Sequence, residues 1–213
     1  SQQVAKRTQQ ASSSFDLSED LTRILIDQQL IDAGWQADSL DLTYSKGARP
    51  EKGKNKAIAE WPTESGPADY VLFCGLTPMA PVEAKRKHVN VSTTIQQAKR
   101  YSRGFKTTAE IRSHGMTWGA KGEFRLPFVF STNGRPYLRQ LDTHSGIWFC
   151  DLRRPENLSR ALQGWFTPDG LTALLKQDEQ AALEQLATET FDYGFDVRFY
   201  QKNSILATEA GIA

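Results

Sequence analysis

The stretch DYVLFCGLTPMAPVEAK, residues 69–85, contains two short apolar runs separated by a turn. The runs DYVLFC (69–74) and PVEA (81–84) have the length and apolar content of buried strands. The glycine and proline within residues 75–78 are typical of a turn. We therefore expect two neighbouring strands that form a hairpin.

The segment before this hairpin predicts an amphipathic helix. Ser18 is a residue type that caps helices, acids follow it in the first turn, where the helix dipole favours them, and Gly34 is well placed to end the helix. The apolar residues of the segment keep roughly helical spacing: Leu17, Leu21, Ile24, Leu25 and Ile31.

The rest of the chain mixes predicted strands with predicted helices. Strands are expected over residues 39–44, 57–61, 128–131, 137–142 and 146–152, the last two as a second hairpin. Helices are expected over residues 93–103, between a Ser92 cap and Gly104, and over 155–165 and 172–187. Because strands and helices do not alternate strictly, we expect a mixed α/β fold, with a central mixed β-sheet flanked by helices.

Composition indicates a globular chain without a membrane span. The chain has 213 residues, of which 39% are hydrophobic, and no apolar run reaches the roughly 18 residues that a spanning helix needs. The polar start of the chain lacks the apolar core of a secretion signal. Cys74 and Cys150 lie in apolar surroundings, which suits buried, reduced thiols. We therefore expect a cytoplasmic protein.

Positive charge is concentrated in two segments. Residues 46–56 carry five bases against Glu51 alone, and residues 85–106 carry seven bases and no acid. Such a cluster repels itself unless it faces an anion, so it is compatible with a polyanionic partner. A solvated basic face is an equally good explanation for the cluster taken alone.

Three residues in and beside the hairpin are suited to phosphodiester hydrolysis. Glu83 and Lys85 are two residues apart on a predicted strand and therefore point to the same face, while Asp69 opens the preceding strand. Mg²⁺ prefers hard oxygen ligands such as one or two carboxylates, and it polarises a phosphate and activates a water. The pattern thus predicts a metal-dependent phosphodiesterase site.

The E-x-K spacing alone is a weak signal. It matches about once by chance in a chain of this length, by average residue usage, and an ion pair on a surface strand explains it equally well. Here it occurs once in the sequence, ends an apolar strand, and leads into an acid-free basic segment. These features favour the nuclease hypothesis without establishing it.

The run ADYVLFCGLTPMAPVEAKRKHVNVSTTIQQAKRYS (68–102) resembles the N-terminal nuclease domain of the restriction (R) subunit of type I restriction–modification enzymes. That domain belongs to the PD-(D/E)XK nuclease superfamily. Similarity extends to LTRILIDQQLIDAGW (21–35), AIAEWP (57–62) and PFVFSTNGRPY (127–137), and FYQKNSI (199–205) resembles the entry to the family's helicase motor. Residues 1–16 are polar and rich in Ser and Gln and are expected to be flexible, while the resemblance implies a nuclease domain at 17–190 and the start of a linker toward the motor at 191–213.

The resemblance implies roles for individual residues. Asp69 and Glu83 would be metal ligands, with Lys85 as the catalytic lysine. Glu19 or Asp20 would correspond to an acid that many superfamily members add to the metal site. Ala68 stands where the superfamily name has proline, a departure that affects no ligand.

A second group of residues is assigned to the positioning of DNA. Gln97 and Tyr101 match the family's Q-x-x-x-Y motif and share one helix face; without the family, an ordinary helix face explains them as well. The neighbouring bases Lys87 and Arg100 are expected to join them.

The resemblance also implies a function and its partners. We expect a Mg²⁺-dependent endonuclease, a type I site-specific deoxyribonuclease, that cuts double-stranded DNA and works with methylation and specificity subunits. ATP is expected to serve only the full-length subunit, because GARPEKGK (47–54) has the wrong glycine spacing for a phosphate loop. This chain is then an N-terminal fragment. Two alternatives stay open: an inactive DNA-binding and assembly module, and a RecB-like nuclease outside restriction.

Overall fold

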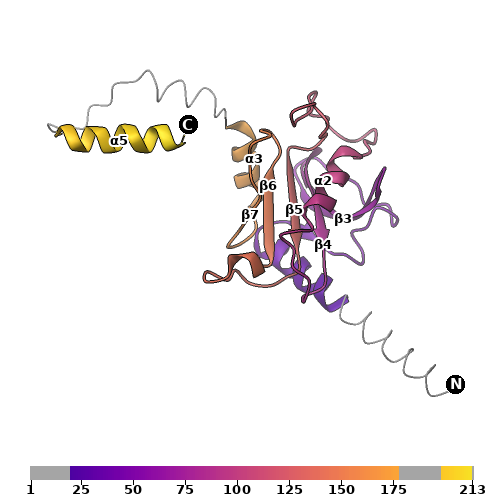
Figure 1. Ribbon diagram of the computed structural model, residues 1–213. Helices are drawn as coiled ribbons and strands as arrows, with labels where there is room; N and C mark the ends of the chain where they lie inside the picture. The colour runs from indigo at the N-terminus through magenta and orange to yellow at the C-terminus, as the bar shows by residue number, and fades with distance from the viewer. Residues whose placement is uncertain (1–19, 178–197, 213) are drawn as a thin grey trace, which may run out of the picture. The chain divides into compact units, whose positions relative to one another are not determined.

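A seven-stranded mixed sheet forms the centre of the computed structural model, which describes residues 20–177 and 198–212 (Figure 1). The spatial order of its strands follows the chain: β1 (Gln36–Ala37), β2 (Asn55–Thr63), β3 (Gly66–Cys74), β4 (Thr77–Ala84), β5 (Phe128–Thr132), β6 (Ile147–Asp151) and β7 (Arg160–Ala161). The pairs β1–β2 and β4–β5 are parallel, and the other neighbouring pairs are antiparallel. The predicted mixed α/β class is confirmed.

Two of the described helices lie on opposite faces of this sheet. Residues 20–32 form one helix; the others described are α2 (Ile95–Arg103), a 3₁₀ turn (Asp142–His144), α3 (Pro168–Lys176) and α5 (Phe199–Ile212). Tyr70 on β3 bonds to the helix 20–32, whereas Val71, the next residue, packs in a cluster with Tyr101 of α2. Because successive strand residues face opposite sides, the two helices cover opposite faces of β3.

The chain divides into two compact units, residues 1–172 and 173–213. The sheet belongs entirely to the first unit. Within it, the buried indole of Trp61 contacts the rings of Tyr44, Phe73 and Phe105 at centroid distances of 5.0, 4.8 and 5.9 Å, and its Nε1–H donates to the Lys106 carbonyl at 3.1 Å. This aromatic cluster fixes α2 against β2 and β3, the strands beside the candidate site.

The predicted hairpin is confirmed. Strands β3 and β4 are antiparallel and joined by a turn at residues 75–76. Strands over 57–61, 128–131 and 146–152 are also present, with bounds that differ by up to two residues. Helix α2 begins at Ile95 rather than after Ser92, because the Asn90 side chain accepts hydrogen bonds from the backbone N–H and hydroxyl of Ser92 and holds a turn there.

The strand predicted over residues 39–44 is wrong. The segment turns instead, and only Thr43 makes a single bridge, to Ala59. The cause is local, because the Asp38 carboxylate accepts the backbone N–H groups of Leu40 and Asp41, both at 2.9 Å. Such bonds offer the backbone an alternative to a strand ladder. The missed strand β1 lies just before this turn.

Two further predictions after β5 are also wrong. Residues 137–142 form no strand, and the predicted second hairpin is instead the pair β5–β6. Residues 155–165 form no helix, because Arg160–Ala161 pairs with β6 as strand β7. Both edges of β6 are thereby occupied, so residues 137–142 have no place beside it. The predicted helix over 172–187 overlaps α3, and its part from residue 178 lies outside the described residues.

The helix 20–32 buries a different face from the one that the apolar spacing indicates. Leu21, Ile24, Leu25 and Ile31 are 38–59% exposed, whereas Ile26 and Leu30 are fully buried. The helix ends before Gly34, which has a φ of +93° as predicted for a helix stop. Leu17 and Ser18 lie outside the described residues.

The cysteines and the absence of a membrane-spanning segment were also predicted from composition, and the described residues bear on both. Cys74 and Cys150 are both free thiols, half-buried and buried respectively, and burial raises the pKa of each. Among the residues that the structure describes, no helix is both long and apolar enough to span a bilayer.

Candidate active site

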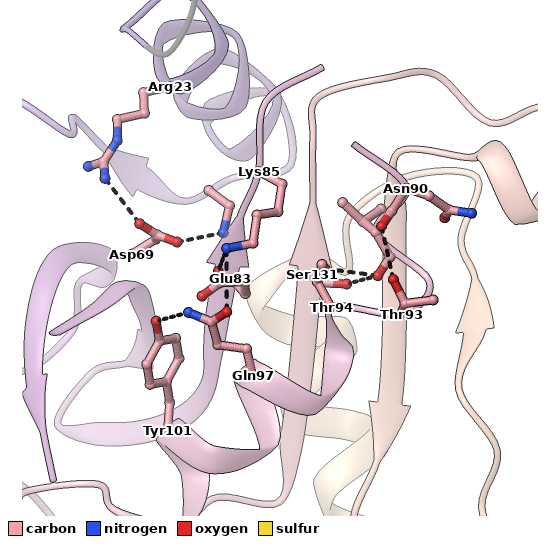
Figure 2. A network of polar contacts seen from close by, with 12 residues as sticks. Arg23, Asp69, Glu83, Lys85, Asn90, Thr93, Thr94, Gln97, Tyr101 and Ser131 are labelled. Carbon is pink, nitrogen blue, oxygen red and sulfur yellow. Dashed lines mark hydrogen bonds and ion pairs between the residues drawn. The ribbon is translucent and has the colours of Figure 1, made fainter. Parts of the chain in front are cut away.

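The hairpin brings Asp69 and Glu83 to adjacent positions on neighbouring strands. Tyr70 pairs with Val82 in the antiparallel ladder, so the residue before Tyr70 lies opposite the residue after Val82. The Ala84 N–H donates to Asp69 Oδ2 at 2.7 Å and fixes that carboxylate (Figure 2). The register of β3 on β4 therefore builds the carboxylate pair, as the sequence predicts.

Glu83 is buried and paired with the predicted lysine. Its side chain is 1% exposed, and Oε1 forms an ion pair with the Lys85 ammonium group, which is itself 30% exposed. Strand β5 holds the C-terminal end of β4 in place. Glu83 pairs with Ser131, and the Lys85 N–H donates to the Thr132 carbonyl at 2.7 Å. Glu83 Oε2 is buried and has no hydrogen-bond partner among the described residues. One oxygen of the buried carboxylate is thus available to a ligand.

Gln97 and Tyr101 extend this network from α2. Lys85 Nζ donates to Gln97 Oε1 at 3.4 Å, and Gln97 Nε2 donates to the Tyr101 hydroxyl at 2.8 Å (Figure 2). Burial raises the pKa of Tyr101, and the negative charge of Glu83 adds to the effect, so the phenol stays protonated. The predicted pair therefore contacts the predicted lysine directly.

Arg23 joins the site, although the sequence did not indicate it. Its guanidinium lies 3.0 Å from Asp69 Oδ1, and the two side chains are 24% and 20% exposed. The sequence predicted an acid from the same helix, but Asp20 is exposed and Glu19 lies outside the described residues. The signal in the sequence was that Arg23 is the one basic residue among residues 20–32.

A second contact holds this helix on the sheet behind the site. The buried Asp27 carboxylate accepts the Tyr70 hydroxyl at 2.9 Å and the N–H and hydroxyl of Ser39 at 2.8 and 2.7 Å. Burial raises the pKa of Tyr70, and the charge of Asp27 adds to the shift, so the phenol remains a donor. Tyr70 follows Asp69 directly, so this contact also positions Asp69.

Lys87 and Arg100 lie outside the hydrogen-bond network of the site. Both side chains are exposed, Lys87 after β4 and Arg100 on α2. The Lys87 carbonyl accepts the Asn133 side-chain amide at 3.4 Å. Their assignment to DNA stays a prediction.

The donor set suits a hard divalent cation. Asp69 and Glu83 supply carboxylate oxygens, and the unpartnered, buried Glu83 Oε2 is an atom that a cation would satisfy. Within the described ranges, no three His, Cys, Asp or Glu side chains come together as a metal-binding group. Mg²⁺ commonly uses one or two carboxylates and completes its shell with waters and phosphate. The residues present therefore fit Mg²⁺ and do not form an all-protein cage.

The raised pKa of Asp69 predicts that the stability of the chain depends on pH. Burial, with a contribution from the charge of Glu83, raises the pKa of Asp69 to about 6 from its ordinary value of 3.8. Between these values the folded chain binds more protons than the unfolded chain, so stability falls as pH rises from about 4 to 6 and then levels. A divalent cation would bind the ionised form of Asp69, so its affinity should rise over the same interval.

Urea unfolding of the metal-free chain across this pH range measures the effect. Asp69→Asn should remove this component of the pH dependence, because its amide does not titrate. Identical pH profiles for Asp69→Asn and the unsubstituted chain would contradict the assignment.

The mixed sheet, with an acid and a lysine at the end of β4 and a second acid beside them on β3, has the architecture of a PD-(D/E)XK restriction-endonuclease-like core. A family model described as "Type I restriction enzyme EcoKI endonuclease subunit second domain" matches residues 36–175, and the chain belongs to this family.

A curated relative carries the name of the same enzyme subunit as the family model. The type I restriction enzyme EcoKI endonuclease subunit of Escherichia coli (strain K12) is 40% identical over 99% of this chain and 20% of its own length. The chain thus spans about a fifth of this relative. No solved structure matches. The resemblance to a type I restriction subunit is confirmed.

Proposed function

We propose that this chain is the Mg²⁺-dependent endonuclease domain of a type I restriction enzyme R subunit and hydrolyses phosphodiester bonds of double-stranded DNA. The observation that carries the proposal is the convergence of buried Glu83 and Lys85, at the end of β4, with Asp69 on the neighbouring strand β3. Family membership supports restriction over a RecB-like role outside it.

Each residue has a role that follows from its contacts. Asp69 and Glu83 would hold Mg²⁺, which supplies polarisation of the phosphate and a water of lowered pKa when bound. Lys85 carries a positive charge beside both carboxylates and is partly exposed, so its ammonium group can contact an incoming phosphate oxygen. Gln97, held by Tyr101, orients that ammonium group.

The relative also suggests the larger enzyme in which this chain would act. In the complete subunit, DNA would be delivered by an ATP-driven motor, and methylation and specificity subunits would determine where the enzyme acts. This proposal rests on the relative's being a type I restriction enzyme subunit and on the small share of it that this chain covers. Sequence recognition is accordingly assigned to other subunits.

Replacement of Lys85 tests the proposal. Lys85→Ala in the complete subunit, assembled with its partner subunits, should lower Mg²⁺-dependent plasmid cleavage by about a hundredfold or more, the scale of a lost proton-transfer or charge contribution. Lys85→Arg should retain part of the activity, because it keeps the charge but changes its geometry. Gel analysis of cleaved plasmid measures both.

Lys121→Ala is a matched control, because Lys121 is exposed in a turn outside the site network. It should leave cleavage unchanged. Full cleavage by Lys85→Ala, with the assembly intact, would show that the site assignment is wrong.

A further inference from the structure

A cationic pocket adjoins the candidate metal site. Its cavity is about 340 Å³, and the described residues that line it include no acid and four basic side chains: Arg23, Lys85, Arg86 and His88. Arg23 comes from the helix 20–32, and the other three lie at and just beyond the end of β4. Figure 2 shows Arg23 and Lys85 approaching the carboxylates from these different elements. The pocket is thus open to an anion next to the carboxylate pair.

Each carboxylate of the site already has a cationic partner. Arg23 contacts Asp69 Oδ1, and Lys85 contacts Glu83 Oε1. The two negative charges of the carboxylates are therefore neutralised by the two positive charges of Arg23 and Lys85. A divalent cation held by Asp69 and Glu83 would add two positive charges near Arg23 and Lys85, and like charges at short distances repel. Such a cation would weaken both ion pairs, but Lys85 also donates to Gln97 Oε1, which holds its ammonium group at the site.

Arg23 has a second position available. Its side chain is 24% exposed and forms part of the pocket wall, so it can turn into the pocket. With Asp69 holding a cation, the favourable partner for Arg23 in the pocket would be an anion that accepts both arms of a guanidinium, and phosphate is such a group. Because the pocket shares Lys85 with the site, a phosphate of the same DNA strand is within its reach.

We propose that the pocket formed by Arg23, Lys85, Arg86 and His88 binds one backbone phosphate of the DNA substrate, and that Arg23 exchanges Asp69 for this phosphate when a divalent cation occupies the carboxylates. The inference rests on the proposed nuclease function. It makes Arg23 a positioning residue that couples the metal to the DNA. By thermodynamic linkage, each ligand then strengthens binding of the other by the same factor.

The exchange has a measurable signature in salt dependence. When the logarithm of the DNA-binding constant is plotted against the logarithm of the salt concentration, one phosphate contact changes the slope by about 1. We expect Ca²⁺, used as a hard divalent probe, to steepen the slope for a short DNA duplex by about this amount in the unsubstituted chain. Arg23→Gln should abolish this Ca²⁺-dependent increase. In the absence of DNA, Arg23→Gln should bind Ca²⁺ several-fold more tightly, because its competitor at Asp69 is gone.

Fluorescence anisotropy of the duplex and calorimetry of Ca²⁺ binding measure the two effects on the full chain. Arg23→Lys retains a point charge and should retain the slope increase, so the result does not depend on one variant's folding. Arg139→Gln removes an exposed arginine between β5 and β6 and should behave as the unsubstituted chain does.

The outcomes separate this inference from the proposed function. If Ca²⁺ binds and Arg23→Gln keeps the full Ca²⁺-dependent slope, the exchange is wrong, whatever cleavage shows. If a free nucleoside triphosphate binds in an Arg23-dependent way while the DNA slope does not change, the pocket serves a free phosphate and the inference is also wrong. Absence of Ca²⁺ binding by the unsubstituted chain would overturn both proposals, whereas active Lys85→Ala with an intact slope effect would overturn only the nuclease assignment.

Discussion

Glu83→Gln should abolish Mg²⁺-dependent DNA cleavage by the complete enzyme while leaving the metal-free chain at least as stable as before. The amide keeps the shape of the side chain but removes the charge that would hold the cation. Loss of the metal's contribution to the transition state should lower the rate about a thousandfold, equivalent to roughly 4 kcal/mol. Stability should not fall, because the substitution removes the repulsion between Glu83 and Asp69, and Lys85 still has Asp69 nearby.

Three measurements check this result: plasmid cleavage, calorimetry of divalent binding to the chain, and its thermal unfolding without metal. Glu156→Gln, at an exposed glutamate, provides the matched control and should change none of them. A variant that loses cleavage but also unfolds at a much lower temperature would assign Glu83 to the structure rather than to the metal. Retained cleavage would remove Glu83 from the site altogether.

Asp27→Ala should produce the largest loss of stability among the polar substitutions considered. Its buried carboxylate accepts three hydrogen bonds, one from Tyr70 and two from Ser39. Alanine would leave these buried donors without an acceptor and separate the helix 20–32 from β3. We expect a loss of about 3 kcal/mol in the free energy of unfolding, measured by urea denaturation.

A double substitution identifies the cause of that loss. Tyr70→Phe removes the buried hydroxyl, so Asp27→Ala combined with Tyr70→Phe should cost less than the sum of the single changes. Additive losses would mean that the Tyr70 hydroxyl does not depend on Asp27. Asp41→Asn, at an exposed aspartate, should have an effect within about 0.5 kcal/mol.

The centre of the site was predictable because it depends on short-range geometry. Glu83 and Lys85 share a strand face at a fixed two-residue spacing, and a two-residue turn places Asp69 opposite them. The contact between Arg23 and Asp69 joins residues that are 46 positions apart and depends on how one helix is rotated against the sheet. That rotation is set by the buried Asp27, which accepts hydrogen bonds from Tyr70 and Ser39. Because Asp27 is polar, the spacing of apolar residues does not predict that it is buried.

Strands that are apolar throughout were predictable, whereas only one of the three alternating segments, residues 146–152, forms a strand of the sheet. Strands β3 and β5 consist mainly of buried residues, so their sequences indicate strands regardless of their neighbours. Residues 39–44 and 137–142 alternate as strands do, yet an aspartate turn controls the first and the second has no free strand edge. Whether an alternating segment joins a sheet depends on partners that the segment does not contain.

The helix 20–32 has a practical consequence for dissecting this subunit. The family match begins at residue 36, after that helix has ended. Ile26 and Leu30 are nevertheless fully buried, and Arg23 and Asp27 contact β3. A cloning boundary drawn from the family model alone would discard part of the folded core together with Arg23 of the site. The smallest piece that can report on this chemistry therefore starts upstream of residue 36.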